Sequence, residues 1–182
     1  MNNHFKLLAL AGFLSSCITI NFQIEGITSD YQYLSYEEKT KVKKLSTFEE
    51  AKAGNVYEIT GMELRKELKK NDSSIVHFFV NKCKSSHCYP MSTYGNYIDE
   101  SGQNVYLIML TYADLDYSLN QEPEFPLYAV NAKYYEERKT RKYRELFVQD
   151  LLQEDYQDAI QYKTFFFNND SLVKVQNDIF ED

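Results

Sequence analysis

Two cysteines stand where an apolar run of the chain ends, and their spacing is compatible with three kinds of chemistry. The stretch "IVHFFVNKCKSSHCYP" begins at Ile75 and ends at Pro90, and four residues separate Cys83 from Cys88. Two thiols this close along a chain can form a catalytic disulfide, a structural disulfide that closes a short loop, or part of a metal site. The residues around the pair favour some of these uses over others.

Cationic side chains surround the pair. Lys82 precedes Cys83, and His87 immediately precedes Cys88. Because the thiolate is the reactive form of cysteine, nearby cations and the amides of a helix N-terminus activate a thiol by lowering its pKa. If a protonated His87 lies near the Cys83 thiolate, we expect it to stabilise the reduced pair and to make the disulfide more oxidising.

A metal site is the weakest of the three alternatives. Cys83, His87 and Cys88 would supply only three ligands, and two of these are adjacent in the sequence. A structural zinc site needs four ligands. The one further histidine outside the N-terminal leader is His77, which lies within the apolar run and is expected to be buried. We therefore expect neither a metal nor another cofactor.

The whole chain has the composition of one globular domain. It has 182 residues, of which 43% are apolar and 26% are charged, and this length is enough to bury a proper core. The formal charge of −7 and a pI near 5.1 argue against a nucleic-acid partner, because such a partner requires a basic face.

The first residues, "MNNHFKLLALAGFLSSC", have the organisation of a targeting segment. Lys6 precedes an apolar stretch from Leu7 to Leu14 that is too short to span a bilayer, which is typical of a cleaved leader. The "LSSC" that ends at Cys17 resembles the lipobox of bacterial lipoproteins. The resemblance implies cleavage before Cys17 and lipid on its sulfur, and Ile18, in place of aspartate, favours the outer membrane. The alternative is an ordinary secretory leader with an incidental cysteine.

Export changes what is expected of the remaining thiols. If Cys17 carries lipid, Cys83 and Cys88 are the only free cysteines, since the chain has three. The surroundings of an exported bacterial protein are oxidising, so we expect the two to pair.

The hydrophobic pattern predicts an α/β protein with a mixed sheet. We expect a signal peptide over 1–16, a lipid-anchored tether with a lead-in helix over 17–47, and the folded domain over 48–182. The expected elements are a lead-in helix at 36–42, strands at 56–59, 75–80 and 105–111, helices at 62–70 and from Pro90 onward, two short strand-like pieces that meet at Asn131, an amphipathic helix around 143–151, and a final hairpin across 168–170. The cysteines would then follow the carboxyl end of a buried strand, where reaction sites of α/β sheets concentrate.

The run "VHFFVNKC" resembles the thioredoxin superfamily, in which a central strand leads into a nucleophilic cysteine. The resemblance implies that Cys83 is the nucleophile, that Cys88 is the resolving cysteine, and that His77 occupies the position of a buried acid that relays a proton. It also implies a cis-proline that faces the disulfide. Pro126 in "FPLYAV" is the preferred candidate, with the backbone of Phe125 receiving the substrate strand.

The chain also departs from that family. Its pair is C-x-x-x-x-C and follows Lys82, whereas the family's hallmark is C-x-x-C after tryptophan. Some peroxiredoxins use the longer spacing, but their nucleophile follows a proline and a threonine at the positions held here by Val76 and Val80. A competing alignment takes "KTFFFNNDSLVKV" as the family's final hairpin, and no proline precedes that strand.

Two functions follow as hypotheses. In the first, the chain is a membrane-anchored thiol–disulfide oxidoreductase of the cell envelope, which acts on protein dithiols and disulfides in the periplasm or at the cell surface, with Lys82 and His87 stabilising the thiolate. In the second, it is a redox-inactive, thioredoxin-like binding or scaffold lipoprotein whose disulfide is structural. In the second case, His77 is a hydrogen-bonded core histidine and Pro126 is an ordinary trans proline.

Overall fold

The computed structural model describes residues 27–82, 89–153 and 156–181. Its elements, in chain order, are η1 (Tyr31–Tyr33), α1 (Tyr36–Lys41), β1 (Val42–Lys44), β2 (Val56–Ile59), α2 (Gly61–Leu68), β3 (Ser74–Phe79), α3 (Met91–Ser101), β4 (Asn104–Met109), α4 (Leu115–Leu119), β5 (Leu127–Val130), α5 (Thr140–Leu152), α6 (Tyr156–Ala159), β6 (Thr164–Asn168) and β7 (Ser171–Gln176).

The strands form one mixed sheet, which confirms the predicted α/β class. Within the described residues the sheet has seven strands in the order β1-β2-β5-β4-β3-β6-β7. The first five of these are parallel to one another, whereas β6 is antiparallel to β3 and β7 is antiparallel to β6. The predicted final hairpin is therefore present, and it lies directly beside β3.

β3 is a strand of the sheet interior and is covered on both faces. All six of its residues are buried, as expected for a largely apolar strand in a parallel region. Val76 and Phe78 point into one apolar cluster, and Ile75 and Phe79 point into the other, because successive side chains of a strand face opposite ways.

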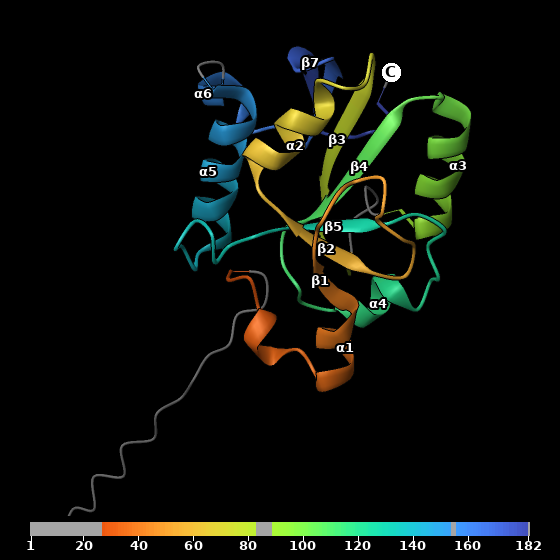
Figure 1. The fold of residues 1–182 in the computed structure, drawn as a ribbon, viewed down its shortest axis with the longest axis vertical. Coiled ribbons are helices and arrows are strands. Elements are labelled where there is room, and N and C mark those ends of the chain that lie inside the picture. The colour runs from red at the N-terminus through yellow and green to blue at the C-terminus, as the bar shows by residue number, and fades with distance from the viewer. Residues whose placement is uncertain (1–26, 83–88, 154–155, 182) are drawn as a thin grey trace, which may run out of the picture.

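Helices cover the two faces of the sheet separately. α2 and α5 pack together on the face of Val76 and Phe78, and α3 lies on the opposite face, as Figure 1 shows. The predicted capping box begins α2. The Thr60 hydroxyl accepts a hydrogen bond from the Glu63 amide, and the Glu63 carboxylate accepts one from the Thr60 amide, which together satisfy two amides that the helix leaves free.

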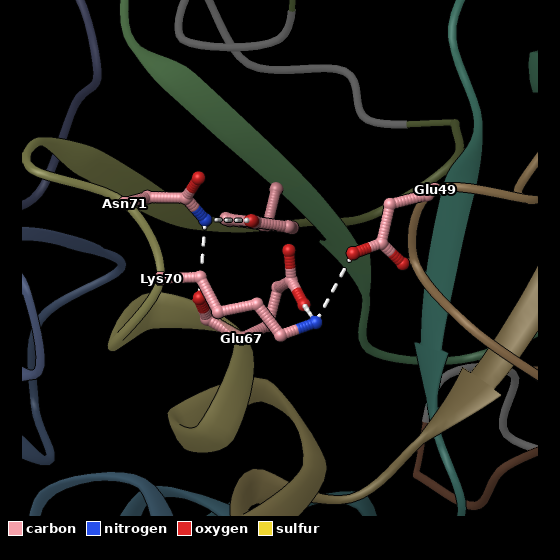
Figure 2. Close-up of polar contacts among 5 residues, drawn as sticks. Glu49, Glu67, Lys70 and Asn71 are labelled. Atoms are coloured by element: carbon pink, nitrogen blue, oxygen red, sulfur yellow. Dashed lines mark hydrogen bonds and ion pairs between the residues drawn. The ribbon is translucent and has the colours of Figure 1, made fainter.

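A polar cluster at the end of α2 ties that helix to its surroundings. The Lys70 Nζ lies 2.7 Å from the buried Glu67 carboxylate and 3.1 Å from that of Glu49 (Figure 2). The Asn71 side chain donates to the Tyr106 hydroxyl of β4 at 3.1 Å. Phe48 packs edge-on against Tyr106, with 5.5 Å between ring centroids. The segment between β1 and β2 is thereby fixed against the sheet.

The sheet extends further toward the N-terminus than the sequence predicted. β1 pairs in parallel with β2, so the expected domain boundary at Phe48 lies within the folded region. Upstream of β1, the Tyr112 and Thr140 amides donate to the carbonyls of Ser29 and Ile27, each at 2.8 Å. Of the predicted 17–47 tether, residues from 27 onward are packed on the domain. The short helix in that region is confirmed as α1.

One other element differs from its prediction. The pattern on either side of Asn131 predicted two short strand pieces, but the structure has a single strand, β5, followed by hydrogen-bonded turns through Tyr134 and Glu136. Among the described residues, none of the helices has both the length and the apolar character needed to cross a bilayer.

Gly61 is the point of closest approach between α2 and α5. A Cβ placed on Gly61 would lie 2.2 Å from the Phe147 carbonyl oxygen and 2.9 Å from the Leu151 nitrogen. These are backbone atoms that cannot move aside locally. The Gly61 amide instead donates to the Tyr135 hydroxyl at 2.9 Å, and that hydroxyl donates to Asp150.

We expect Gly61→Ala to lower the free energy of unfolding by about 1–3 kcal/mol, because the added methyl group forces the two helices apart. Urea unfolding followed by far-ultraviolet circular dichroism measures the effect. Gly95→Ala is the matched control, since the corresponding Cβ within α3 makes only an ordinary 3.5 Å contact and alanine favours helix. Equal effects of the two substitutions would contradict the role given to Gly61.

Candidate functional site

The candidate site lies at the carboxyl end of β3. The described chain stops there at Lys82 and resumes at Tyr89, directly before α3. The predicted site residues Cys83, His87 and Cys88 lie between these two positions, outside the described residues. Cys17 is also outside the described residues. The described residues on both sides of that gap nevertheless form a defined environment.

A cavity of about 70 Å³ with both polar and apolar lining residues opens at this place. That volume is large enough for water molecules. Most of its lining residues come from the end of β3, the start of α3, α4, the residue before β6 and the segment after β7. The polar side chains of the lining are those of His77, Asn81, Tyr89, Tyr94, Tyr117, Lys163, Asn177 and Asp178.

His77 is held at this cavity by partners on two elements. It is only 5% exposed. Its Nδ1 lies 2.8 Å from the Thr164 hydroxyl, the residue directly opposite in the antiparallel β3–β6 register. Its Nε2 lies 3.4 Å from the hydroxyl of Tyr94 on α3. A neutral imidazole satisfies both contacts when Nδ1 donates to Thr164 and Nε2 accepts from Tyr94.

Burial keeps this imidazole neutral. Removal from water disfavours the charged form and lowers the pKa of His77 to about 4, a shift that nearby Asp178 partly opposes and Lys163 reinforces. At neutral pH, the His77 imidazole is therefore uncharged. Burial likewise raises the pKa of the Tyr94 hydroxyl, so that hydroxyl remains protonated and able to donate.

Asn81 fixes the turn by which the chain leaves β3. Its side-chain amide donates to the carbonyls of Thr111 and Ala113 at 3.0 and 2.9 Å, and its oxygen accepts from the Ser118 hydroxyl at 2.8 Å. All of these partners belong to α4 or to the segment between β4 and α4. The segments that follow β3 and β4 are thereby held together by the buried side chain of Asn81.

Lys82 has a partner of its own. Its Nζ lies 3.5 Å from the Asp114 carboxylate at the start of α4, and the Lys82 side chain is 53% exposed. Lys82 was predicted to stabilise the thiolate. The structure places it at the end of the described chain before Cys83, where it contacts the Asp114 carboxylate.

Pro126 and Phe125 lie at the other end of the sheet. Pro126 directly precedes β5, which runs parallel to β4, as β4 does to β3. The proline is therefore at the amino end of its strand, whereas the cavity is at the carboxyl end of β3. No cis peptide bond occurs within the described residues. The structure does not bring these two residues to the end of β3, beside the cavity. The sequence could not reveal this, because an apolar strand after a proline says nothing about the direction of that strand.

The strand that does begin beside the cavity is β6, as the competing alignment required. Lys163 precedes it, and the Lys163 carbonyl accepts from the Phe78 amide at 2.8 Å. The position that the superfamily resemblance would give to a proline is thus held by a lysine that lines the cavity.

Two further residues at the site were not predicted. Asp178 accepts a hydrogen bond from the Tyr89 hydroxyl at 2.8 Å, and this bond is the main cause that raises the pKa of Tyr89. Phe180 packs on the same tyrosine, with 4.3 Å between ring centroids. Both follow β7, in a stretch whose sequence has no periodicity that could have indicated their role.

Neither a family model nor a curated protein matches this chain. No solved structure matches it. The described residues also contain no group of three or more His, Cys, Asp or Glu side chains that could hold a metal ion.

The lowered pKa of His77 predicts that stability falls in mild acid. The unfolded chain binds a proton near pH 6.5 and the folded chain only near pH 4, so the contribution of His77 is complete above pH 6.5 and is lost as the pH falls toward 4. Between pH 7 and pH 5, we expect this residue to reduce the free energy of unfolding by about 2 kcal/mol. Urea unfolding of the wild type and of His77→Gln at both pH values measures it. A stability difference between the two proteins that is constant across this range would contradict the assignment.

The bonds of Asn81 predict a second effect on stability. We expect Asn81→Ala to lower the free energy of unfolding by about 2–3 kcal/mol, because two carbonyls and a hydroxyl lose their partner in a buried place. Thermal and urea unfolding provide the measurement. Asn104→Ala, at an exposed position at the start of β4, should change stability by less than about 0.5 kcal/mol.

Proposed function

We propose that this chain is a thiol–disulfide oxidoreductase that uses Cys83 and Cys88. The observation that carries the proposal is the buried, neutral His77 beside a water-sized cavity, on the strand that leads into the cysteine segment. A titratable side chain beside such a cavity is a candidate relay for a thiol proton during disulfide exchange. Its lowered pKa makes the imidazole a weak base, so the relay would pass the proton on to solvent rather than keep it. A purely structural disulfide has no need of such a relay.

The arrangement of elements supports a thioredoxin-like assignment for the domain. An interior strand leads into the cysteine segment, α3 follows that segment, and the β6–β7 hairpin lies beside β3. These features agree with the resemblance of "VHFFVNKC" in the alignment that ends on that hairpin. In this alignment, Pro126 and Phe125 have no part in substrate binding.

The proposed reduction of a substrate proceeds in two exchanges. The Cys83 thiolate attacks one sulfur of a protein disulfide, and the other substrate sulfur leaves as a thiolate that takes a proton from water. The Cys88 thiol then gives its proton to Nε2 of the neutral His77 imidazole, which gives up its 3.4 Å contact with the Tyr94 hydroxyl. The Cys88 sulfur attacks Cys83. The mixed disulfide breaks, and the second substrate sulfur leaves and is protonated in the same way. Two electrons pass from the pair to the substrate, and another protein dithiol must restore the reduced pair.

Surface residues beside the cavity would meet the substrate. Val80 and Tyr117 both line the cavity, and they are 44% and 49% exposed. Hydrophobic and aromatic side chains that remain exposed at the rim of a cavity are suited to contact an incoming polypeptide. His87 remains our candidate for stabilising the Cys83 thiolate, whereas Lys82 is engaged by Asp114.

The cellular setting is part of the same proposal. Lipid on Cys17 would hold the domain on a bacterial membrane, with the outer membrane favoured, and the domain would act in the periplasm or at the cell surface. The oxidising envelope would supply protein disulfides and dithiols as partners. The proposal needs neither a metal nor an organic cofactor.

A second candidate function is a redox-inactive binding or scaffold lipoprotein with a structural disulfide. Three observations favour it. His77 is a buried, hydrogen-bonded histidine, and Pro126 follows a trans peptide bond. Lys163 stands before β6, where the superfamily resemblance calls for a proline that faces the disulfide. The same fold could then present a binding surface without exchanging thiols.

The reduction potential of the Cys83–Cys88 pair distinguishes the two functions. We expect a midpoint between about −120 and −270 mV for a catalytic dithiol, whereas a value below about −300 mV indicates a structural disulfide. The Cys17→Ser protein without its leader would be equilibrated in glutathione or dithiothreitol buffers and analysed by alkylation gel shift, because the chain has no tryptophan to report by fluorescence. Cys83→Ser and Cys88→Ser are the controls, and neither should show a two-electron transition.

A further inference from the structure

The segment after β7 folds back over the α3 face of the sheet. We call residues 177–181 the C-terminal strap. The Gln176 side-chain amide donates to the carbonyls of Asp178 and Glu181 at 2.6 and 3.0 Å, and the Phe180 amide donates to the Asp178 carboxylate at 3.1 Å. The strap is therefore a hydrogen-bonded turn attached to the end of β7.

Apolar side chains dock the strap onto the domain. Ile179 is 2% exposed and belongs to the cluster on the α3 face of the sheet. The Phe180 ring lies over tyrosines that border or adjoin the cavity, with centroid distances of 4.3 Å to Tyr89, 5.8 Å to Tyr94 and 5.4 Å to Tyr97. Phe180 therefore reaches His77 through Tyr94, whose hydroxyl lies 3.4 Å from the His77 Nε2.

The strap also brings a charge to the same place. Asp178 lines the cavity with His77 and accepts the hydroxyl hydrogen bond of Tyr89. The titratable and charged groups of the described chain that line the cavity with His77 are Tyr94 of α3, Tyr89 before it, Tyr117 of α4, Lys163 before β6 and Asp178 of the strap. Asp178 is the only carboxylate among them, so it is the described group that favours a proton on the imidazole.

We propose that the C-terminal strap is the gate through which His77 exchanges a proton with solvent, with Asp178 and Phe180 as positioning residues that act on His77 in opposite directions. The proposal rests on the oxidoreductase function, in which His77 takes the proton of Cys88 and must then release it. Asp178 stabilises the imidazolium by its negative charge. Phe180 excludes water and thereby destabilises the imidazolium.

This opposition follows from elementary electrostatics. A carboxylate near a buried imidazole favours the protonated form, and the loss of water around the ring favours the neutral form. The two effects come from residues two positions apart on one short segment. A strap that lifts away therefore changes both at once, whereas single substitutions separate them.

The experiment is a pH titration of His77 by nuclear magnetic resonance in the full chain, with labelled histidine. The chain has three histidines, and the resonance lost in His77→Gln identifies the one of interest. In the wild type, we expect a midpoint near pH 4. Phe180→Ala should raise the midpoint by about one unit or more, toward the value of 6.5 for a solvated imidazole. Asp178→Asn should lower it by about half a unit.

The matched control is Glu181→Gln, which removes a charge from an exposed side chain of the same strap and should leave the midpoint within about 0.2 units of the wild type. Phe180→Leu retains a folded apolar strap with a smaller side chain and should give an intermediate rise, so the test does not depend on Phe180→Ala alone. A midpoint unchanged by both Phe180 substitutions, or raised by Asp178→Asn, would overturn the proposal.

The outcome is independent of the thiol chemistry. The titration reports on His77 and the strap whether or not the cysteines exchange electrons, whereas the reduction potential reports on the cysteines alone. If the potential indicates a structural disulfide while His77 responds as expected, the oxidoreductase function fails and the strap's control of the proton stands. The reverse pair of results overturns the gate and leaves the oxidoreductase.

Discussion

The hydrogen bond between His77 and Thr164 joins the parallel part of the sheet to its antiparallel part. On one side of it, β3 and the four strands beyond it run in parallel. On the other side, β6 and β7 run as an antiparallel hairpin. His77 and Thr164 are buried polar residues of neighbouring strands, and each supplies the hydrogen-bond partner of the other. The register that places His77 opposite Thr164 therefore aligns the end of β3 with the start of β6, and the cavity lies between these two strand ends.

Close packing on the opposite face holds the same strand from behind. α2 and α5 approach to backbone contact at Gly61, and Phe147 of α5 stacks edge-on against Phe78 of β3, with 5.7 Å between ring centroids. Arg144 lies over the same Phe78 ring and donates to the carbonyls of Ile160 and Tyr162, just before β6. The position of His77 is thus set by contacts on both faces of β3, and only one of those faces borders the cavity.

The elements that were predictable are those that local sequence determines. The apolar run of β3, the capping box at Thr60 and the turn residues around Asn169 each fix a conformation within a few residues, and each prediction is confirmed. Pro126 was misplaced because strand order and direction depend on contacts between distant segments, which a single strand's pattern does not contain. Asp178 was missed for a related reason. Its role arises only when the end of the chain folds against α3, and nothing in the residues 177–181 alone indicates that partner.

The N-terminal segment of the described chain has a mechanical consequence. Ile27 and Ser29 are joined by backbone hydrogen bonds to Thr140, at the start of α5, and to Tyr112, just beyond β4. Any pull on the chain upstream of Ile27 therefore reaches these two bonds before it reaches a strand of the sheet. Neither bond belongs to a strand pair of the sheet, so breaking them would free the chain upstream of η1 and leave the pairing of β3 intact. A force applied at the N-terminus would in this way reach those two bonds before it reached the strand that carries His77.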